Sequence, residues 1–426
     1  MIPSNSTWNL SQKIGFRFAF SYFILHIFPF FITYIPFTEW FTTFYADAQR
    51  SFIVWVGKHV VNVGEITIFP RGSGDTTYNY VEIFTFFVVA LFVTIVWSIL
   101  DRKRKNYTRF LKVFSIYVSY YVATIMLSYG FSKVFYLQFS APSLNRLLQP
   151  YGDSSPMGIA WTFMGASKTY TMFSGFAEVI GGFLLFGRRT RTFGALVVFA
   201  VMFNVFMMNM SYDIPVKLYS LHLMLMALFV MMLDYKRIFN LFILKKPFEV
   251  PALQTRYFKN KKVGITVLVL KIAFVGYASY LMYSSSQSYA EQRNDLPKPV
   301  LYGIYDVETY VVNKDTLPPL LTDTTRWKKM ICDKRFGNYI VTKGMNDASS
   351  WFKYEIDTIK NTLEMVNTRD STNVYNFNYI KKDSTLVFEG VWKQDTLKIK
   401  MDEFDLTKFR LTNRGFHWIN EYPYNR

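Results

Sequence analysis

The sequence predicts an α-helical membrane protein of about seven spans, followed by a C-terminal antiparallel β-barrel of lipocalin type. Three observations lead to this prediction. Several apolar runs approach the ~20 residues needed to cross a hydrocarbon core. Basic residues collect between alternate runs. From about residue 300 the chain becomes polar and alternates with a period of two, which is typical of a sheet with one buried face.

The apolar runs define the expected spans and one further helix. The spans are expected at 15–37, 79–100, 114–136, 169–187, 193–210, 216–233 and 263–283. Pro29 and Pro36 predict a kink or an early end in the first of them. The run 41–63 is interrupted by charged residues and predicts an amphipathic helix at the outer membrane interface.

The distribution of basic residues predicts the orientation. Lys and Arg gather in 101–112, in 188–191 and between the sixth and seventh spans, so these loops are expected in the cytoplasm. The first apolar run lacks a signal-cleavage pattern and is expected to remain as an anchor. We therefore expect a bacterial cytoplasmic (inner) membrane protein with a cytoplasmic N-terminus and a periplasmic C-terminal domain. The same distribution argues against nucleic acid as a partner, despite the net charge of +18.

The domains expected along the chain are 1–112 with the first two spans, 113–235 with four spans, 236–299 with a basic loop, the last span and a linker, and 300–426 with the β-domain. Three serines from Ser284 onward, with Pro297 and Pro299, predict the linker. Leu386 and Phe388 are expected on the buried face of one strand. The aromatic tail after residue 410 is expected either as a terminal strand tucked onto the barrel or as a lip that binds a ligand or partner.

Ionisable residues between 129 and 222 form the candidate site. Such groups are costly in lipid and usually face protein or water. The expected outward-facing pocket, with Glu178 and Asn204 as its floor, consists of Lys133, Glu178, Asn204, Asn209, Asp213, Lys217 and His222. Glu178, Lys133 and His222 are the candidates for proton handling.

Each of these residues also has a structural interpretation. Glu178 shares a helix face with Gly175 and Gly182, which lets a second helix approach, so it is either an ion-pair partner of Lys133 or Lys217 or a proton-handling acid. His222 is either a packing residue or a group that responds to pH. Lys217 either binds a ligand in the pocket or extends its amine to the membrane interface. Asp213 fits a turn. Lys271 needs a partner, with Glu178 or Glu82 as candidates, and His26 is expected to hydrogen-bond between helices.

Several chemistries lack their sequence signals. The chain has no nucleotide-binding loop, no HExxH and no GxSxG. Its one cysteine excludes an internal disulfide, a CxxC pair and a cysteine-rich metal site, so no metal is expected. No cofactor is encoded, and catalysis stays uncertain.

Three segments carry a family resemblance: YGFSKVF, AEVIGGFLLFGRRTRTFGAL and NMSYDIPVKLYSLHL. Together they make residues from about Tyr117 to Asp234 resemble the four-helix core of the DoxX family. The resemblance covers roughly a quarter of the chain. It implies a redox-associated membrane subunit whose pocket binds quinone or lipid, with an envelope or redox protein as partner of residues 300–426.

Besides this redox-associated subunit, two alternatives remain. The first is a non-catalytic envelope scaffold or assembly factor that uses its β-domain to bind a partner. The second is a carboxylase-like enzyme with a lysine base. The latter rests on a weaker similarity to vitamin K-dependent carboxylase-like proteins, which also carry Lys and Glu on successive spans. The GRRTR block favours DoxX.

Overall fold

The computed structural model of the chain describes residues 7–68, 74–246, 260–294, 296–392 and 394–425. The chain forms two compact units. The helical unit comprises 1–138 and 169–287, and the barrel unit comprises 139–168 and 288–426. The barrel unit is therefore built from two separate stretches of sequence.

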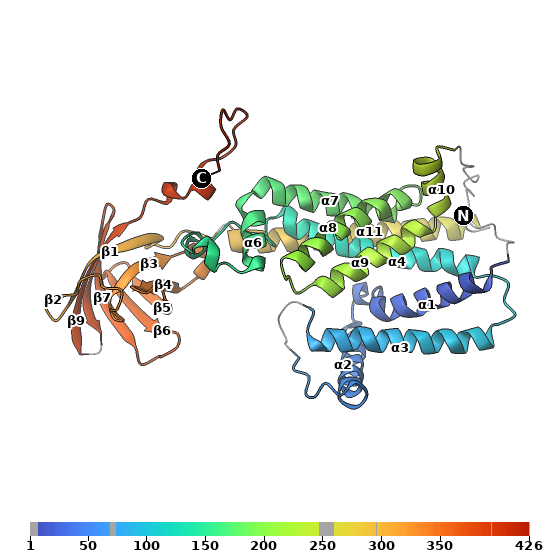
Figure 1. Cartoon of the computed structure of the whole chain (residues 1–426), viewed down its shortest axis with the longest axis horizontal. Coiled ribbons are helices and arrows are strands. Elements are labelled where there is room, and N and C mark those ends of the chain that lie inside the picture. Colours follow the sequence, from blue (N-terminus) through green and yellow to red (C-terminus); the bar gives the residue numbers. More distant parts are fainter. Residues whose placement is uncertain (1–6, 69–73, 247–259, 295, 393, 426) are drawn as a thin grey trace. The chain divides into compact units, whose positions relative to one another are not determined.

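The helical unit is built mainly from long helices (Figure 1). Its elements are α1 (Leu10–Ile27), η1 (Ile32–Tyr34), α2 (Glu39–Val56), η2 (Gly57–Val61), α3 (Thr77–Leu100), α4 (Thr108–Val134), α7 (Lys168–Phe186), α8 (Arg191–Ser211), α9 (Lys217–Met232), α10 (Tyr235–Phe239), η4 (Asn240–Leu244) and α11 (Lys261–Asn294). Helices occupy all seven expected spans, and α2 covers most of the expected amphipathic helix.

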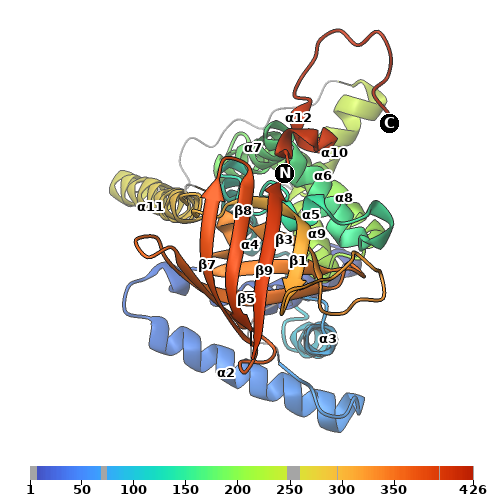
Figure 2. The ribbon, with the colours of Figure 1, turned by 90° about the vertical axis from the view of Figure 1, so that its left-hand side faces the viewer.

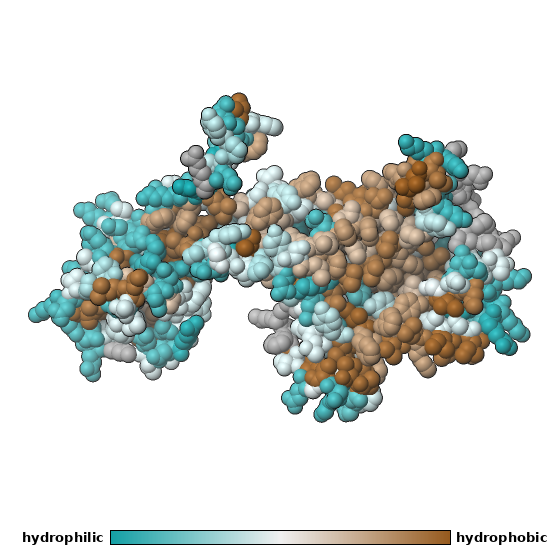
Figure 3. All heavy atoms as spheres, in the orientation of Figure 1, coloured by the Kyte–Doolittle hydropathy of each residue, from teal (hydrophilic) through white to brown (hydrophobic). Residues whose placement is uncertain are grey.

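Within the described residues, six helices are long and apolar enough to cross a membrane. A seventh span exists if α9 and the segment 235–244, which meet at a bend of 79°, count as one. Hydrophobic side chains cover much of the visible face of this unit (Figure 3), as the apolar runs predict.

One core holds these helices together. It is built from α1, α4, α7, α8 and α9, with Val118, Leu127, Leu185, Val198 and Ala227 almost fully buried. Helix α11 contributes only partly buried residues such as Phe274. The four helices expected to form a bundle therefore do share a core, and α1 belongs to it as well.

Two helix ends test the sequence predictions. Helix α1 ends at Ile27, before Pro29, which confirms the expected early end. The prediction that a linker starts at Ser284 is wrong, because α11 continues through the serines to Asn294. Three serines are weak helix breakers, since their side chains compete only modestly for the backbone.

The barrel unit contains a closed antiparallel sheet in which consecutive strands pair, except that β3 pairs with β1 rather than with the short β2. Its strands are β1 (Gly303–Val312), β2 (Asp315–Thr316), β3 (Trp327–Cys332), β4 (Tyr339–Gly344), β5 (Ser349–Asp357), β6 (Thr362–Asn367), β7 (Val374–Lys382), β8 (Thr385–Trp392) and β9 (Asp395–Glu403). Pairing of β1 with β9 closes the ring, while β2 only extends β1 (Figure 2). The expected up-and-down barrel is confirmed.

The barrel interior is filled with apolar and aromatic side chains. Leu386, Phe388 and Ile399 are fully buried, while Lys398 and Lys400 point outward, as the alternation predicts. Strand β3 does not show this alternation. The sequence WKKMIC of β3 places two lysines side by side, which breaks the period-two signal.

The connection between α4 and α7 packs on the outer wall of the barrel. It contains α5 (Leu144–Leu147), η3 (Tyr151–Asp153) and α6 (Pro156–Ala166). Leu144 belongs to a second apolar cluster with Ile304, Ile331 and Val341, which face outward from β1, β3 and β4. Residues 139–168 were expected within the four-helix core 113–235, whereas the structure groups them with the barrel.

Polar contacts fix this connection to the barrel wall. The buried Asp333 carboxylate accepts the backbone N–H of Leu144 at 2.8 Å. Arg335 donates to the carbonyl oxygens of Ala141 and Pro142. A buried carboxylate that loses its donors is costly, so Asp333 ties the two stretches of this unit together.

The C-terminal tail differs from its first interpretation. After β9 the chain forms η6 (Leu406–Lys408) and α12 (Arg410–Asn413), and no strand follows among the described residues. Phe416, Trp418 and Tyr422 are 75%, 90% and 82% exposed. The tail is therefore not tucked onto the barrel.

Candidate functional site

Lys133 and Glu178 form a buried ion pair between α4 and α7. The Lys133 Nζ atom lies 2.7 Å from both carboxylate oxygens of Glu178. The side chains are only 7% and 3% exposed. The expected pairing of these two residues is thus present in the structure.

Glycines bring the two helices close enough for this pair. A Cβ added at Gly130 would lie 2.9 Å from the carbonyl oxygen of Gly175, and one at Gly175 would lie 2.7 Å from that of Gly130. Gly182 likewise lies against the backbone of Ala123. The small residues beside Glu178 therefore permit the close helix approach that the sequence predicts.

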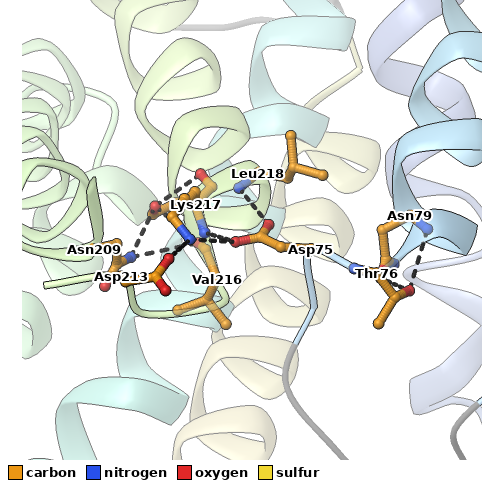
Figure 4. A network of polar contacts seen from close by, with 9 residues as sticks. Asp75, Thr76, Asn79, Asn209, Asp213, Val216, Lys217 and Leu218 are labelled. Carbon is orange, nitrogen blue, oxygen red and sulfur yellow. Dashed lines mark hydrogen bonds and ion pairs between the residues drawn. The ribbon is translucent and has the colours of Figure 1, made fainter. Parts of the chain in front are cut away.

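Asn209, Asp213 and Lys217 meet where α8 turns into α9 (Figure 4). Lys217 Nζ lies 2.8 Å from Asp213, and this contact lowers the pKa of the exposed Asp213 carboxyl through a hydrogen bond and charge attraction. Asn209 donates to the Ser220 hydroxyl at 3.0 Å. These contacts are those of a turn and a helix start rather than of an open pocket.

Asp75 completes this group and was missed by the sequence analysis. Its carboxylate accepts the backbone N–H groups of Lys217 at 2.7 Å and Leu218 at 2.9 Å, so it caps α9 from another part of the chain (Figure 4). Lys217 Nζ lies 3.9 Å from the same carboxylate. Sequence alone could not find it, because the cap is 142 residues away from the helix that it serves.

His222 is held in one orientation by two hydrogen bonds. Its Nδ1 atom lies 2.6 Å from the carbonyl oxygen of Leu218 and therefore carries the proton. In the neutral ring, Nε2 then accepts the hydroxyl proton of Tyr22 at 2.7 Å. The His26 ring lies beside it, with centroids 4.4 Å apart and the ring planes tilted by 40°.

A cavity of about 390 Å³ lies beside these two histidines. It is formed where α1 ends and α3 and α9 begin. Its wall combines polar groups with apolar ones and includes Leu25, His26, Gln49, Asp75, Asn79, Glu82, Ile83, Phe86, Tyr129, Tyr219, His222, Leu223 and Met226. His26 Nε2 is buried and has no hydrogen-bond partner among the described residues, so the expectation that His26 hydrogen-bonds between helices is wrong for this atom.

A second cavity of about 560 Å³ adjoins the first. Both are lined by Phe28, Gln49 and Asn79. Gln49 on α2 donates to the Glu82 carboxylate on α3 at 2.9 Å. The amphipathic helix α2 therefore forms part of the cavity wall.

The structure brings together only part of the predicted pocket. His222 lines the first cavity, and Tyr129 of the cavity wall lies beside Lys133, whose Nζ is 5.6 Å from its ring. Asn204 is exposed on α8 and is not part of this group, because the buried face of α8 carries Val198, Met202 and Asn209 instead. The cavity thus has different principal residues from those predicted.

Lys271 has neither of the partners expected for it. Its Nζ atom donates to the carbonyl oxygen of Phe186, at 2.7 Å. Glu178 is occupied by Lys133, and Glu82 accepts from Gln49. Lys271 therefore satisfies a carbonyl at the end of α7, where a cation is favoured.

Arg17 is a second polar residue that sequence reasoning missed. It is 1% exposed and donates to the Tyr107 hydroxyl, to Ser98 Oγ and to the carbonyl oxygen of Asp101. Tyr107 in turn donates to the Asp101 carboxylate at 2.8 Å. The network joins α1 to the connection between α3 and α4, which is a structural role.

The comparisons with known proteins add one partial match. No family model matches the chain, and no solved structure matches it. The uncharacterized protein YwoB of Bacillus subtilis (strain 168) is 36% identical over 84 residues, or 20% of this chain and 54% of that protein. The chain thus spans about half the length of the curated relative that it matches. The DoxX resemblance stays a prediction.

Proposed function

We propose that this chain is an integral membrane protein whose helical unit binds a quinone, or another amphiphile with a carbonyl headgroup, in the cavity beside His26 and His222. We further propose that it serves as a redox-associated subunit of a DoxX-like kind in the bacterial cytoplasmic membrane. The observation that carries the proposal is the buried Nε2 of His26, which has no partner among the described residues, on a residue whose cavity wall combines polar groups with apolar and aromatic ones.

The composition of the wall supports an amphiphilic ligand. Apolar side chains such as Leu223, Met226 and Phe86 suit a ring or chain, while a few polar groups orient a headgroup. A protonated His26 Nε2 would donate to a carbonyl oxygen. Glu82 lines the same cavity and is a group that can exchange a proton with a bound ligand.

The distribution of charge supports the proposed orientation. Arg102, Arg104 and Arg189 lie in the connections where α3 and α7 end and α4 and α8 begin, and Arg237 follows the end of α9, so all four are at one end of the helical unit. The cavity lies at the other end, near the start of α9. By the positive-inside rule the basic end is cytoplasmic, which leaves the cavity and the chain after α11 on the opposite side.

A test of ligand binding follows from the chain's own histidines. The full-length protein is purified in detergent and extracted for mass spectrometry of quinones and phospholipids, alongside His26→Phe and the matched control His59→Phe, whose ring is exposed on η2. We expect a quinone in the parent protein and in H59F, and its loss in H26F. Phospholipid in its place would identify a lipid site. The proposal fails if the parent carries neither, or if H26F retains the same amount.

A second candidate function is an envelope scaffold that binds a protein partner through the barrel unit. The exposed aromatic tail favours it, since Trp418 and Tyr422 are the kind of residues that anchor interfaces. A photo-reactive residue at Trp418 should cross-link a specific protein in cells, and one at the exposed Arg369 should not. Equal labelling from both positions would contradict this role.

The carboxylase-like alternative is disfavoured by the ion pair. A lysine base needs a free, neutral amine. Lys133 instead lies with its Nζ atom 2.7 Å from both oxygens of Glu178, so its amine is not free. We therefore assign Lys133 and Glu178 to the structural joint between α4 and α7.

A further inference from the structure

Arg326 is a buried cation with unused hydrogen-bond donors in the barrel unit. It directly precedes β3 and is 3% exposed. Its Nη2 atom donates to the carbonyl oxygens of Val307 at 3.1 Å and Glu308 at 3.2 Å, where β1 shifts register against β9. Its Nε and Nη1 atoms are buried and make no hydrogen bond to a described residue. Three of the five N–H groups therefore lack an acceptor.

The acidic residue nearest in sequence is occupied elsewhere. Asp323 Oδ1 accepts the backbone N–H groups of Thr325 at 2.7 Å and Arg326 at 3.0 Å, which shapes the turn into β3. Its charge still reaches the guanidinium electrostatically. A buried guanidinium with unused donors is costly unless an acceptor reaches it.

Tyr310 supplies a second unused donor near Arg326. It lies in β1, its side chain is fully buried, and its hydroxyl has no hydrogen-bond partner among the described residues. Burial raises the pKa of this hydroxyl, so it stays a neutral donor. Tyr310 packs against Trp327, the residue that directly follows Arg326 in the chain.

Aromatic rings border this polar region inside the barrel. The Trp327 ring centroid lies 6.0 Å from that of Tyr310 and 5.3 Å from that of Tyr375. Tyr375 stacks on Trp392 at 5.4 Å.

We propose that the barrel binds a small monocarboxylate through Arg326 and Tyr310. A carboxylate has several acceptor positions for donors that come from different directions. The planar guanidinium suits it better than a monatomic anion. A dianion is disfavoured, because one buried positive charge is opposed by Asp323. The aromatic border favours an organic anion over inorganic phosphate.

This site is independent of the cavity beside His26, because the two lie in separate units of the chain. A protein that binds no quinone would leave the proposed carboxylate site in the barrel intact. A protein that binds no carboxylate would likewise leave the proposed quinone site intact. Neither Arg326 nor Tyr310 lines either of the two cavities described in the helical unit.

The test is a titration of the full-length protein in detergent with carbon-13-labelled acetate, followed by NMR. The variants are Arg326→Gln, Tyr310→Phe and the control Arg369→Gln, which makes the same change at an exposed position. We expect the parent and R369Q to bind acetate alike. Y310F should bind about tenfold more weakly, the equivalent of ~1.4 kcal/mol, and R326Q should not bind.

Several results would overturn the proposal. They are the absence of acetate binding by the parent, unchanged binding by R326Q, and displacement of acetate by equimolar chloride, which would indicate an adventitious ion only. If R326Q fails to fold by circular dichroism, Y310F decides, because it removes one oxygen atom only. Parent-like acetate affinity in a folded Y310F would then refute the role of the hydroxyl and the site as proposed.

Discussion

The ion pair of Lys133 and Glu178 yields the sharpest prediction about the helical unit. Replacing Lys133 by Met keeps the length of the side chain and removes its charge. It leaves the Glu178 carboxylate, 3% exposed, without the two contacts of 2.7 Å that Lys133 makes with it. The variant must then bury an uncompensated charge, protonate the acid or admit water.

The expected cost follows from this geometry. Breaking a buried pair by removing one partner typically costs about 3–5 kcal/mol, whereas replacing both partners by apolar groups is often nearly neutral. For a folded unit of this size, each kcal/mol lowers the melting temperature by roughly 2–4 °C. We therefore expect Lys133→Met to lower the melting temperature by roughly 6–20 °C.

The assay compares four proteins in one detergent by circular dichroism and by scanning fluorescence. They are the parent, Lys133→Met, the double variant Lys133→Met/Glu178→Leu, and the control Lys103→Met in an exposed loop. The single variant should be clearly destabilised. The double variant should recover most of the loss, and the control should match the parent.

Two results would refute this reasoning. One is a K133M protein within 2 °C of the parent, which would mean that water or protonation relieves the charge at little cost (a threshold of about 1 kcal/mol). The other is a double variant as unstable as the single one. In that case the helix joint would depend on the shape of these side chains rather than on the charge pair.

Three further predictions concern other parts of the molecule. Asp75→Ala removes the cap of α9 and should cost about 1 kcal/mol, seen as a lower melting temperature, while the exposed Asp213→Ala should leave it unchanged. Asp333→Ala should open the connection 139–150 to limited proteolysis without unfolding the barrel, and an unchanged digestion pattern would contradict the proposed tie. Burial raises the pKa of Cys332 from 9.0 to about 12. The folded thiol should therefore react slowly with iodoacetamide at pH 9, and its stabilising contribution should be complete below pH 9 and be lost as the pH rises toward 12. Rapid alkylation of the folded protein would refute this.

The sequence predicted the elements of this chain better than their contacts. Apolar runs of span length and period-two alternation are local signals, and they located the helices and most of the strands. Strand β3 could not be recognised from the sequence, because its two adjacent lysines interrupt the alternation of apolar and polar residues. Helix α11 was cut short at Ser284, because a cluster of serines resembles a linker when only composition is read.

The candidate site shows the same limit. The Lys133–Glu178 pair could be inferred, because each residue is isolated in an apolar run and needs an opposite charge. Asp75 and His26 could not be placed at the cavity, since their positions depend on how α1, α3 and α9 pack together. Asn204 was placed wrongly relative to the others, because depth along a helix does not specify which face a residue occupies.

The discontinuous barrel unit has a consequence for the order of events during synthesis. Leu144 lies on a barrel wall whose Asp333 is 189 residues further along the chain. At ~5–20 residues per second, a ribosome needs roughly 10–40 s to make that interval. During this time the apolar side chains of the 139–148 segment have no wall to cover. A chaperone that binds nascent chains should therefore recognise this segment first, and release it only when the strands of the barrel have been made.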